Sequence, residues 1–177
     1  MEQKNLILGF DFGKKYSQFC CYDRGTHTAV SIPVKEGEKA AEFPTAIARK
    51  RNEEVWKTGS DAEEFARTEN GIWLDQLYEI CMGSRICQIE NRDYTPGEIL
   101  GAFLLEALKM IGIEHPEEQI QAMMITTGHL TRPFVENVRE AYKKIGLPRG
   151  RAYLQEHDES FYCHVLNQKP ELWSRKV

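Results

Sequence analysis

Three short apolar segments at the start of the chain limit its fold more than any other feature of the sequence. Residues 5–12, 16–23 and 27–33 are rich in β-branched, aromatic and other apolar side chains, and Gly13 and Gly25 separate them. Short strands joined by tight, glycine-containing turns are typical of an antiparallel meander. These segments therefore predict the first three strands of a sheet.

The next segments predict a hairpin and a short helix. Residues 43–50 and 54–59 have strand character, and the polar residues 51–53 between them are suited to a turn. A helix is expected directly afterwards. Ser60 is its predicted N-cap, and Glu63 stands three residues later, where it closes a capping box.

Residues 95–112 carry the clearest helix signal in the sequence. Thr95 is suited to the N-cap, Pro96 stands at the first helical position, and Glu98 completes a capping box. Apolar residues recur with helical spacing through the segment. The preceding residues, 70–94, show no clear period, and we expect a mixed surface segment there.

The second half of the chain alternates strands with helices. Residues 120–128 form a nearly continuous apolar run, which indicates a buried strand. A helix is predicted within 130–148, a strand at 151–155 and a last helix at 156–167. The whole order predicts an α/β fold, in which helices flank a mixed sheet and a small subdomain is inserted at about 34–94.

Composition excludes several classes of protein. The chain has 177 residues, 41% of them hydrophobic, and a formal net charge of −4, which disfavours nucleic-acid backbone binding as a main function. Its five cysteines lack C-x-x-C spacing, which argues against a disulfide framework and a zinc site. No apolar run approaches the roughly 20 residues of a membrane span. We expect a cytoplasmic protein that binds neither nucleic acid nor membrane.

The turn after the first predicted strand is the candidate for chemistry. Asp11, Gly13, Lys14 and Lys15 stand where the chain doubles back. A plain hairpin turn explains this pattern, since turns use Asp and Gly often. A phosphate-binding loop explains it as well: consecutive backbone amides bind anions, glycine permits close approach, and a carboxylate holds hydrated Mg²⁺. The residues alone leave both interpretations open.

Four histidines suggest a metal site, but their spacing does not support one. His115, His129, His157 and His164 include no pair with reliable ligand spacing. We expect no metal other than nucleotide-bound Mg²⁺.

Several local strings, taken in their order along the chain, resemble the actin-like ATPase superfamily, which includes sugar kinases and heat-shock chaperone ATPases. The closest resemblance is to the N-terminal lobe of DnaK-type chaperones, and it covers roughly residues 5–167. The strings are "LGFDFGKKYSQFCCYD", "EFPTAIARK" with "VWKTGSDAEEFA", "TPGEILGAFLLEALKMI" and "QAMMITTGHLTRPFVENVREAYKKIGLPRGRAYLQEHDESF".

The resemblance implies a ribonuclease H-like lobe that occupies residues 1–167, followed by a tail at 168–177 that leads toward a second lobe. It implies ATP or ADP with Mg²⁺ as the ligand of the full-length, two-lobe protein, with no tight binding expected for this lobe alone. It also implies a first phosphate loop that contains Asp11, Gly13, Lys14, Lys15 and Tyr16.

The resemblance also implies two catalytic carboxylates. Asp11 would face the metal, and Glu156 would lie near the water that attacks the γ-phosphate. Such chemistry depends mainly on positioning and charge compensation. A purely structural role for Glu156, as an acid favoured at the start of a helix, is the alternative.

The chain departs from the chaperone pattern at three places, one of which is the segment HDESF after Glu156, where the chaperones have a proline and small residues. Lys14 and Lys15 stand where the chaperones have two hydroxyl residues, and no lysine lies near Leu77, where their phosphate-contacting lysine is expected. The resemblance implies that a second lobe, in cis or in trans, supplies a second phosphate loop and the adenosine site. An ATPase lobe of this kind, with a protein client or co-factor, is one hypothesis. A degenerate, non-catalytic interaction or scaffold module on the same fold is the other.

Overall fold

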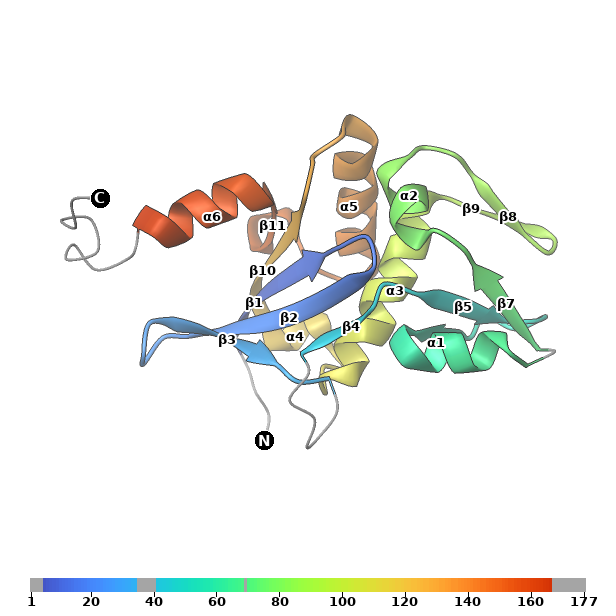
Figure 1. Cartoon of the computed structure of the whole chain (residues 1–177), viewed down its shortest axis with the longest axis horizontal. Helices are drawn as coiled ribbons and strands as arrows, with labels where there is room; N and C mark the ends of the chain where they lie inside the picture. The colour runs from blue at the N-terminus through green and yellow to red at the C-terminus, as the bar shows by residue number, and fades with distance from the viewer. Residues whose placement is uncertain (1–4, 35–40, 69, 167–177) are drawn as a thin grey trace, which may run out of the picture.

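The computed structural model describes residues 5–34, 41–68 and 70–166, and its largest element is a mixed six-stranded sheet (Figure 1). Its strands lie in the order β11-β10-β1-β2-β3, and β4 also pairs with β2. They are β1 (Leu6–Phe12), β2 (Tyr16–Asp23), β3 (Thr28–Ile32), β4 (Glu42–Pro44), β10 (Ile120–Thr127) and β11 (Ala152–Glu156).

The predicted meander is confirmed. β1 pairs with β2, and β2 with β3, in antiparallel register. β10 then runs parallel to β1, and β11 runs parallel to β10. The helix α5 (Arg132–Lys144) lies between these two parallel strands in the chain, as a parallel connection requires. The fold is therefore mixed α/β, with helices flanking a mixed sheet.

Alternation along β1 gives this strand one face in the core and one face directed away from it. Leu8, Phe10 and Phe12 are almost fully buried. The ring of Phe12 stacks on that of Phe134 in α5, with centroids 5.8 Å apart. Asp11 points to the opposite face, because successive side chains of a strand alternate.

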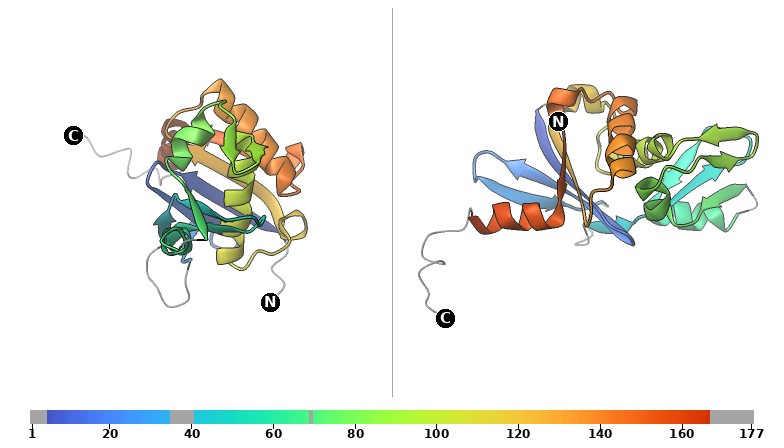
Figure 2. Two further views of the ribbon diagram at one scale, coloured as in Figure 1. Left: turned by 90° about the vertical axis from the view of Figure 1, so that its right-hand side faces the viewer. Right: turned by 90° about the horizontal axis from the view of Figure 1, so that it is seen from above.

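Helices on one face of the main sheet form the core with it. α3 (Pro96–Met110) begins with the predicted capping box: Glu98 N–H donates to Thr95 Oγ1 over 3.0 Å, and Thr95 N–H donates to Glu98 Oε2 over 2.9 Å. α3 and α5 pack side by side, and α4 (Pro116–Gln119) leads into β10. The last helix, α6 (His157–Leu166), has no buried residue and extends on the other side of the sheet (Figure 2).

A small unit, residues 47–94, lies between β4 and α3 in the chain. Its three-stranded sheet has the order β6-β5-β7, and α1 packs against all three strands. A two-stranded hairpin, β8–β9, completes it. The elements are β5 (Ile47–Lys50), β6 (Trp56–Thr58), α1 (Gly59–Ala66), β7 (Gly71–Leu74), α2 (Leu77–Met82), β8 (Cys87–Ile89) and β9 (Arg92–Tyr94).

Two local predictions for this region need correction. α1 begins at Gly59, with Thr58 at the N-cap, so the expected N-cap at Ser60 is wrong. The reason is that the Thr58 hydroxyl donates to Ala46 O over 2.9 Å, and Gly59, at φ +61°, turns the chain directly from strand to helix. The expectation of a surface segment at 70–94 is also wrong in part, because Tyr94 is fully buried.

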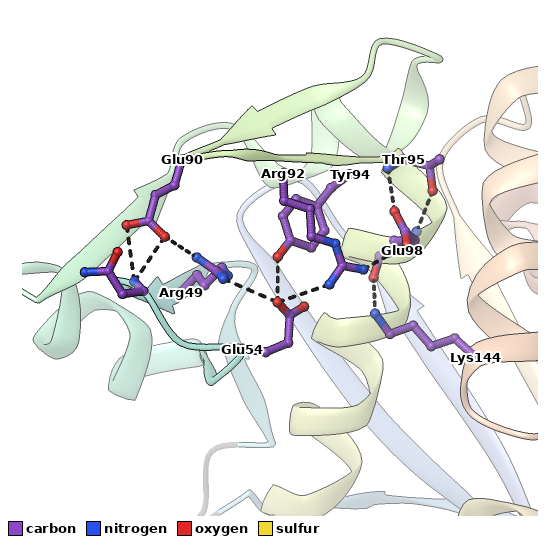
Figure 3. A network of polar contacts seen from close by, with 9 residues as sticks. Arg49, Glu54, Glu90, Arg92, Tyr94, Thr95, Glu98 and Lys144 are labelled. Atoms are coloured by element: carbon purple, nitrogen blue, oxygen red, sulfur yellow. Dashed lines mark hydrogen bonds and ion pairs between the residues drawn. The ribbon is translucent and has the colours of Figure 1, made fainter.

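A network of polar contacts joins the small unit to the start of α3 (Figure 3). Tyr94 OH donates to Glu54 Oε2 over 2.7 Å, and the Arg92 guanidinium lies 4.5 Å from the centroid of the Tyr94 ring. Arg92 also lies 3.3 Å from Glu54 and 3.4 Å from Glu98 of the capping box. The cap of α3 and the buried end of β9 are therefore held by the same charges.

Across the described residues, no helix is long and apolar enough to cross a membrane. The predicted tail at 168–177 lies outside the described residues, as do residues 35–40 of the expected insertion.

Candidate functional site

The strands β1, β10 and β11 are parallel, so their carboxyl ends lie together at one end of the main sheet. Asp11 is paired with Thr126, and Thr127 with Glu156. In open α/β sheets, ligands bind outside the carboxyl ends of parallel strands. The pairing thus brings the two predicted catalytic carboxylates to the same end of the sheet, with β10 between them.

Asp11 is half-exposed and is already held by side chains of neighbouring elements. His157 Nε2, from the first residue of α6, lies 2.7 Å from Asp11 Oδ1. Thr126 Oγ1, from β10, donates to the same oxygen over 3.5 Å. A histidine–carboxylate contact therefore connects α6 to β1 directly at the predicted metal ligand.

Glu156, the last residue of β11, has a different set of partners. Its Oε1 accepts the backbone N–H of Leu130 over 2.6 Å and lies 3.1 Å from His129 Nδ1. Leu130 and His129 belong to the loop between β10 and α5. The carboxylate thus bonds the loop that leads into α5.

The turn at Gly13 to Lys15 is held from the side by the residue that follows β4. Thr45 Oγ1 donates to Gly13 O over 2.8 Å, and Thr45 N–H donates to Lys15 O over 2.9 Å. A Cβ atom on Gly13 would overlap the carbonyl oxygen of Tyr16. Position 13 therefore requires glycine for steric reasons, and two hydrogen bonds from Thr45 brace the turn.

The two lysines of the turn have different surroundings. Lys14 Nζ lies 2.5 Å from Glu79 Oε1 of α2, and this hydrogen bond and charge raise the pKa of Lys14. Lys15 forms no ion pair with any residue that the structure describes. Lys14 therefore links the turn to the small unit.

A cavity of about 550 Å³ separates the turn from the small unit. Lys14, Lys15 and Tyr16 line it on one side, and Trp73 and Gln76 on the other. Asp11 and Glu156 are not among its lining residues. The predicted site residues thus form two groups: one lies at the carboxyl ends of β1 and β11, and the other lines this cavity.

The comparisons with known proteins give a family without an assigned activity. A family model described as "Family of unknown function (DUF5716) C-terminal" matches residues 28–177. The chain belongs to this family. A search of curated proteins found no match.

The range matched by the DUF5716 model divides the candidate site. It includes His129, Glu156 and His157, whereas Asp11 and the Gly13 turn precede it. The contact between His129 and Glu156 thus lies wholly inside the DUF5716 match.

Two histidines of the DUF5716 chain were not predicted to belong to the site. His129 follows the end of β10, and His157 follows the end of β11, so both stand directly beyond parallel strands. The position of both histidines just after a predicted strand was the available signal. Thr126 was missed because its contact with Asp11 depends on strand pairing.

The single carboxylate at the end of β1, Asp11, is compatible with Mg²⁺ that a nucleotide binds through its phosphates. Among the described residues, no group of three or more His, Cys, Asp or Glu could hold a metal ion. Nucleotide-bound Mg²⁺ needs only one or two carboxylates, because waters and phosphate oxygens complete its shell. Asp11 is suited to that single position.

Proposed function

We propose that this DUF5716 chain is the ATP-binding lobe of an actin-like, chaperone-related ATPase, and that a second lobe completes its cleft. One observation carries the proposal: Asp11 and Glu156, far apart in sequence, lie on either side of the carboxyl end of β10. Further support comes from the mixed sheet and the separate small unit, which the resemblance to such a lobe implies.

The residues at this end of the sheet and in the Gly13 turn would each have a separate role. Asp11 would hold hydrated Mg²⁺, and the Gly13 turn with Lys15 would bind phosphate oxygens. Glu156, kept in place by the Leu130 amide, would orient the attacking water. Bound Mg²⁺ supplies charge compensation for the phosphate oxygens.

Calorimetric titration with MgATP and MgADP tests the proposal directly. The described chain and the longest natural form should each be titrated, with Asp11→Ala beside them. Asp93→Ala, which removes an exposed carboxylate in the small unit, is the matched control. We expect saturable binding by the longer form, at least tenfold weaker in Asp11→Ala and unchanged in Asp93→Ala. Absence of binding by the longer form would reject the proposal.

A second candidate function is a non-catalytic interaction module on this fold. Three contacts favour it: His157 with Asp11, His129 with Glu156, and Lys14 with Glu79. Each gives a predicted nucleotide-site charge a partner within the chain, as expected where a site has become structural. The same titration separates the candidates, because an interaction module would show no saturable nucleotide binding in any form.

A further inference from the structure

A groove runs between α5 and β11, on the outer side of the main sheet. Its volume is about 840 Å³, and it is separate from the cavity beside the Gly13 turn. Val135, Ala152 and Leu154, which are partly exposed, supply apolar surface within it. This size lies within the range of cavities that hold peptide side chains or small ligands.

The charged residues of the groove are mostly basic. Arg139, Lys143 and Arg149 line it and are exposed, whereas Glu140 is its one lining carboxylate. Within the part of the chain that the structure describes, none of the three basic side chains forms an ion pair. The groove is therefore basic in a chain whose formal net charge is −4.

One wall of the groove is the end strand of the main sheet. β11 pairs with β10 on one side, and no described strand pairs with its other side. End strands present unpaired N–H and C=O groups, and proteins usually protect them with Lys, Pro or a covering element. β11, with the sequence AYLQE, contains neither Lys nor Pro, and Tyr153 is 48% exposed.

We propose that this groove and the free edge of β11 bind an extended acidic segment of a partner protein. The segment adds a strand beside β11, where main-chain hydrogen bonds give affinity and alternate side chains enter the groove. Side chains alternate along the added strand, so its acidic residues face α5 and contact Arg139, Lys143 and Arg149, whereas its apolar residues lie on the opposite face beside the exposed Tyr153. A helix in the groove would leave the edge of β11 unpaired, so an extended partner fits both features.

The binding test uses two designed peptides and one nucleic acid. A fluorescein-labelled peptide of alternating valine and glutamate is titrated with the full chain at low salt, beside the valine–lysine counterpart and a labelled oligo-dT. We expect saturable binding of the glutamate peptide, at least tenfold tighter than that of the other two probes. Equal binding of the lysine peptide or of oligo-dT, or no binding of the glutamate peptide, would overturn the proposal.

Charge-reversal variants locate the binding to the groove. Arg139→Glu combined with Lys143→Glu should weaken the glutamate peptide at least tenfold. Lys57→Glu reverses an exposed charge on β6 of the small unit, and it should leave binding unchanged. Thermal unfolding of each variant identifies any loss of folding. Equal effects of the double variant and the control would place the peptide elsewhere.

Hydrogen exchange distinguishes strand addition from other modes of binding. With the glutamate peptide bound, the amides of β11 that point away from β10 should exchange more slowly, because a new strand uses these N–H groups. Protection confined to α5 would indicate a helical ligand and would contradict the proposed mode.

Discussion

At the scale of single residues, the turn after β1 depends on the absence of a side chain at position 13. An added Cβ on Gly13 would overlap the carbonyl oxygen of Tyr16. This oxygen belongs to the backbone, so it cannot move aside as the end of a flexible side chain could. We expect Gly13→Ala to destabilise the chain by about 1–3 kcal/mol, because the braced turn must shift to relieve the overlap. Urea unfolding measures this loss.

Gly150→Ala is the control for that substitution. Nothing lies within 4 Å of a Cβ atom at Gly150, which is exposed. Its free energy of unfolding should therefore change by no more than about 0.5 kcal/mol. Equal stability of the Gly13 and Gly150 variants would show that the turn adapts freely.

At the scale of elements, Tyr94 links the hairpin β8–β9 to β5, β6 and α3. Burial, and then the hydrogen bond to Glu54, raise the pKa of its phenol above the ordinary value. We expect Tyr94→Phe to cost about 1–2 kcal/mol, because it removes a hydrogen bond to a carboxylate while it keeps the buried ring. Tyr153→Phe removes an exposed hydrogen bond to Gly150 O and should cost less than about 0.5 kcal/mol.

The direction of the Tyr94 shift also predicts a pH dependence. A phenol whose pKa is raised on folding contributes stability below its unfolded pKa, near 10, and that stability is lost as pH rises through the folded value. The wild-type chain should therefore lose more stability than Tyr94→Phe between pH 9 and pH 11. Parallel urea titrations over this range measure the difference, and identical pH profiles would contradict it.

At the scale of the whole molecule, α6 exposes apolar side chains that the rest of the described chain does not cover. Phe161 and Tyr162 are each 67% exposed, and Leu166 is 64% exposed. Exposed apolar surface of this kind favours self-association. We expect the sedimentation coefficient to rise with concentration, and Phe161→Ser with Tyr162→Ser to abolish the rise. A clean wild-type monomer over a wide concentration range would count against this expectation.

Much of the local structure follows from short-range signals in the sequence. The meander was predicted because its strands are separated by short turns, and the start of α3 because Thr95, Pro96 and Glu98 act within one helical turn. The prediction of Ser60 as the N-cap was wrong because the helix begins one residue earlier, at Gly59, whose positive φ local patterns do not reveal.

By itself, the sequence determined the meander, the later strands of the main sheet, the main helices and the candidate residues at the ends of β1 and β11. Only the tertiary structure decided which residues contact them. Parallel pairing with β10 brought Thr126 beside Asp11, and the return of the chain through α5 and β11 placed His157 on the same carboxylate. The physical reason is distance along the chain: such contacts depend on strand pairing between segments more than a hundred residues apart, which no local pattern encodes.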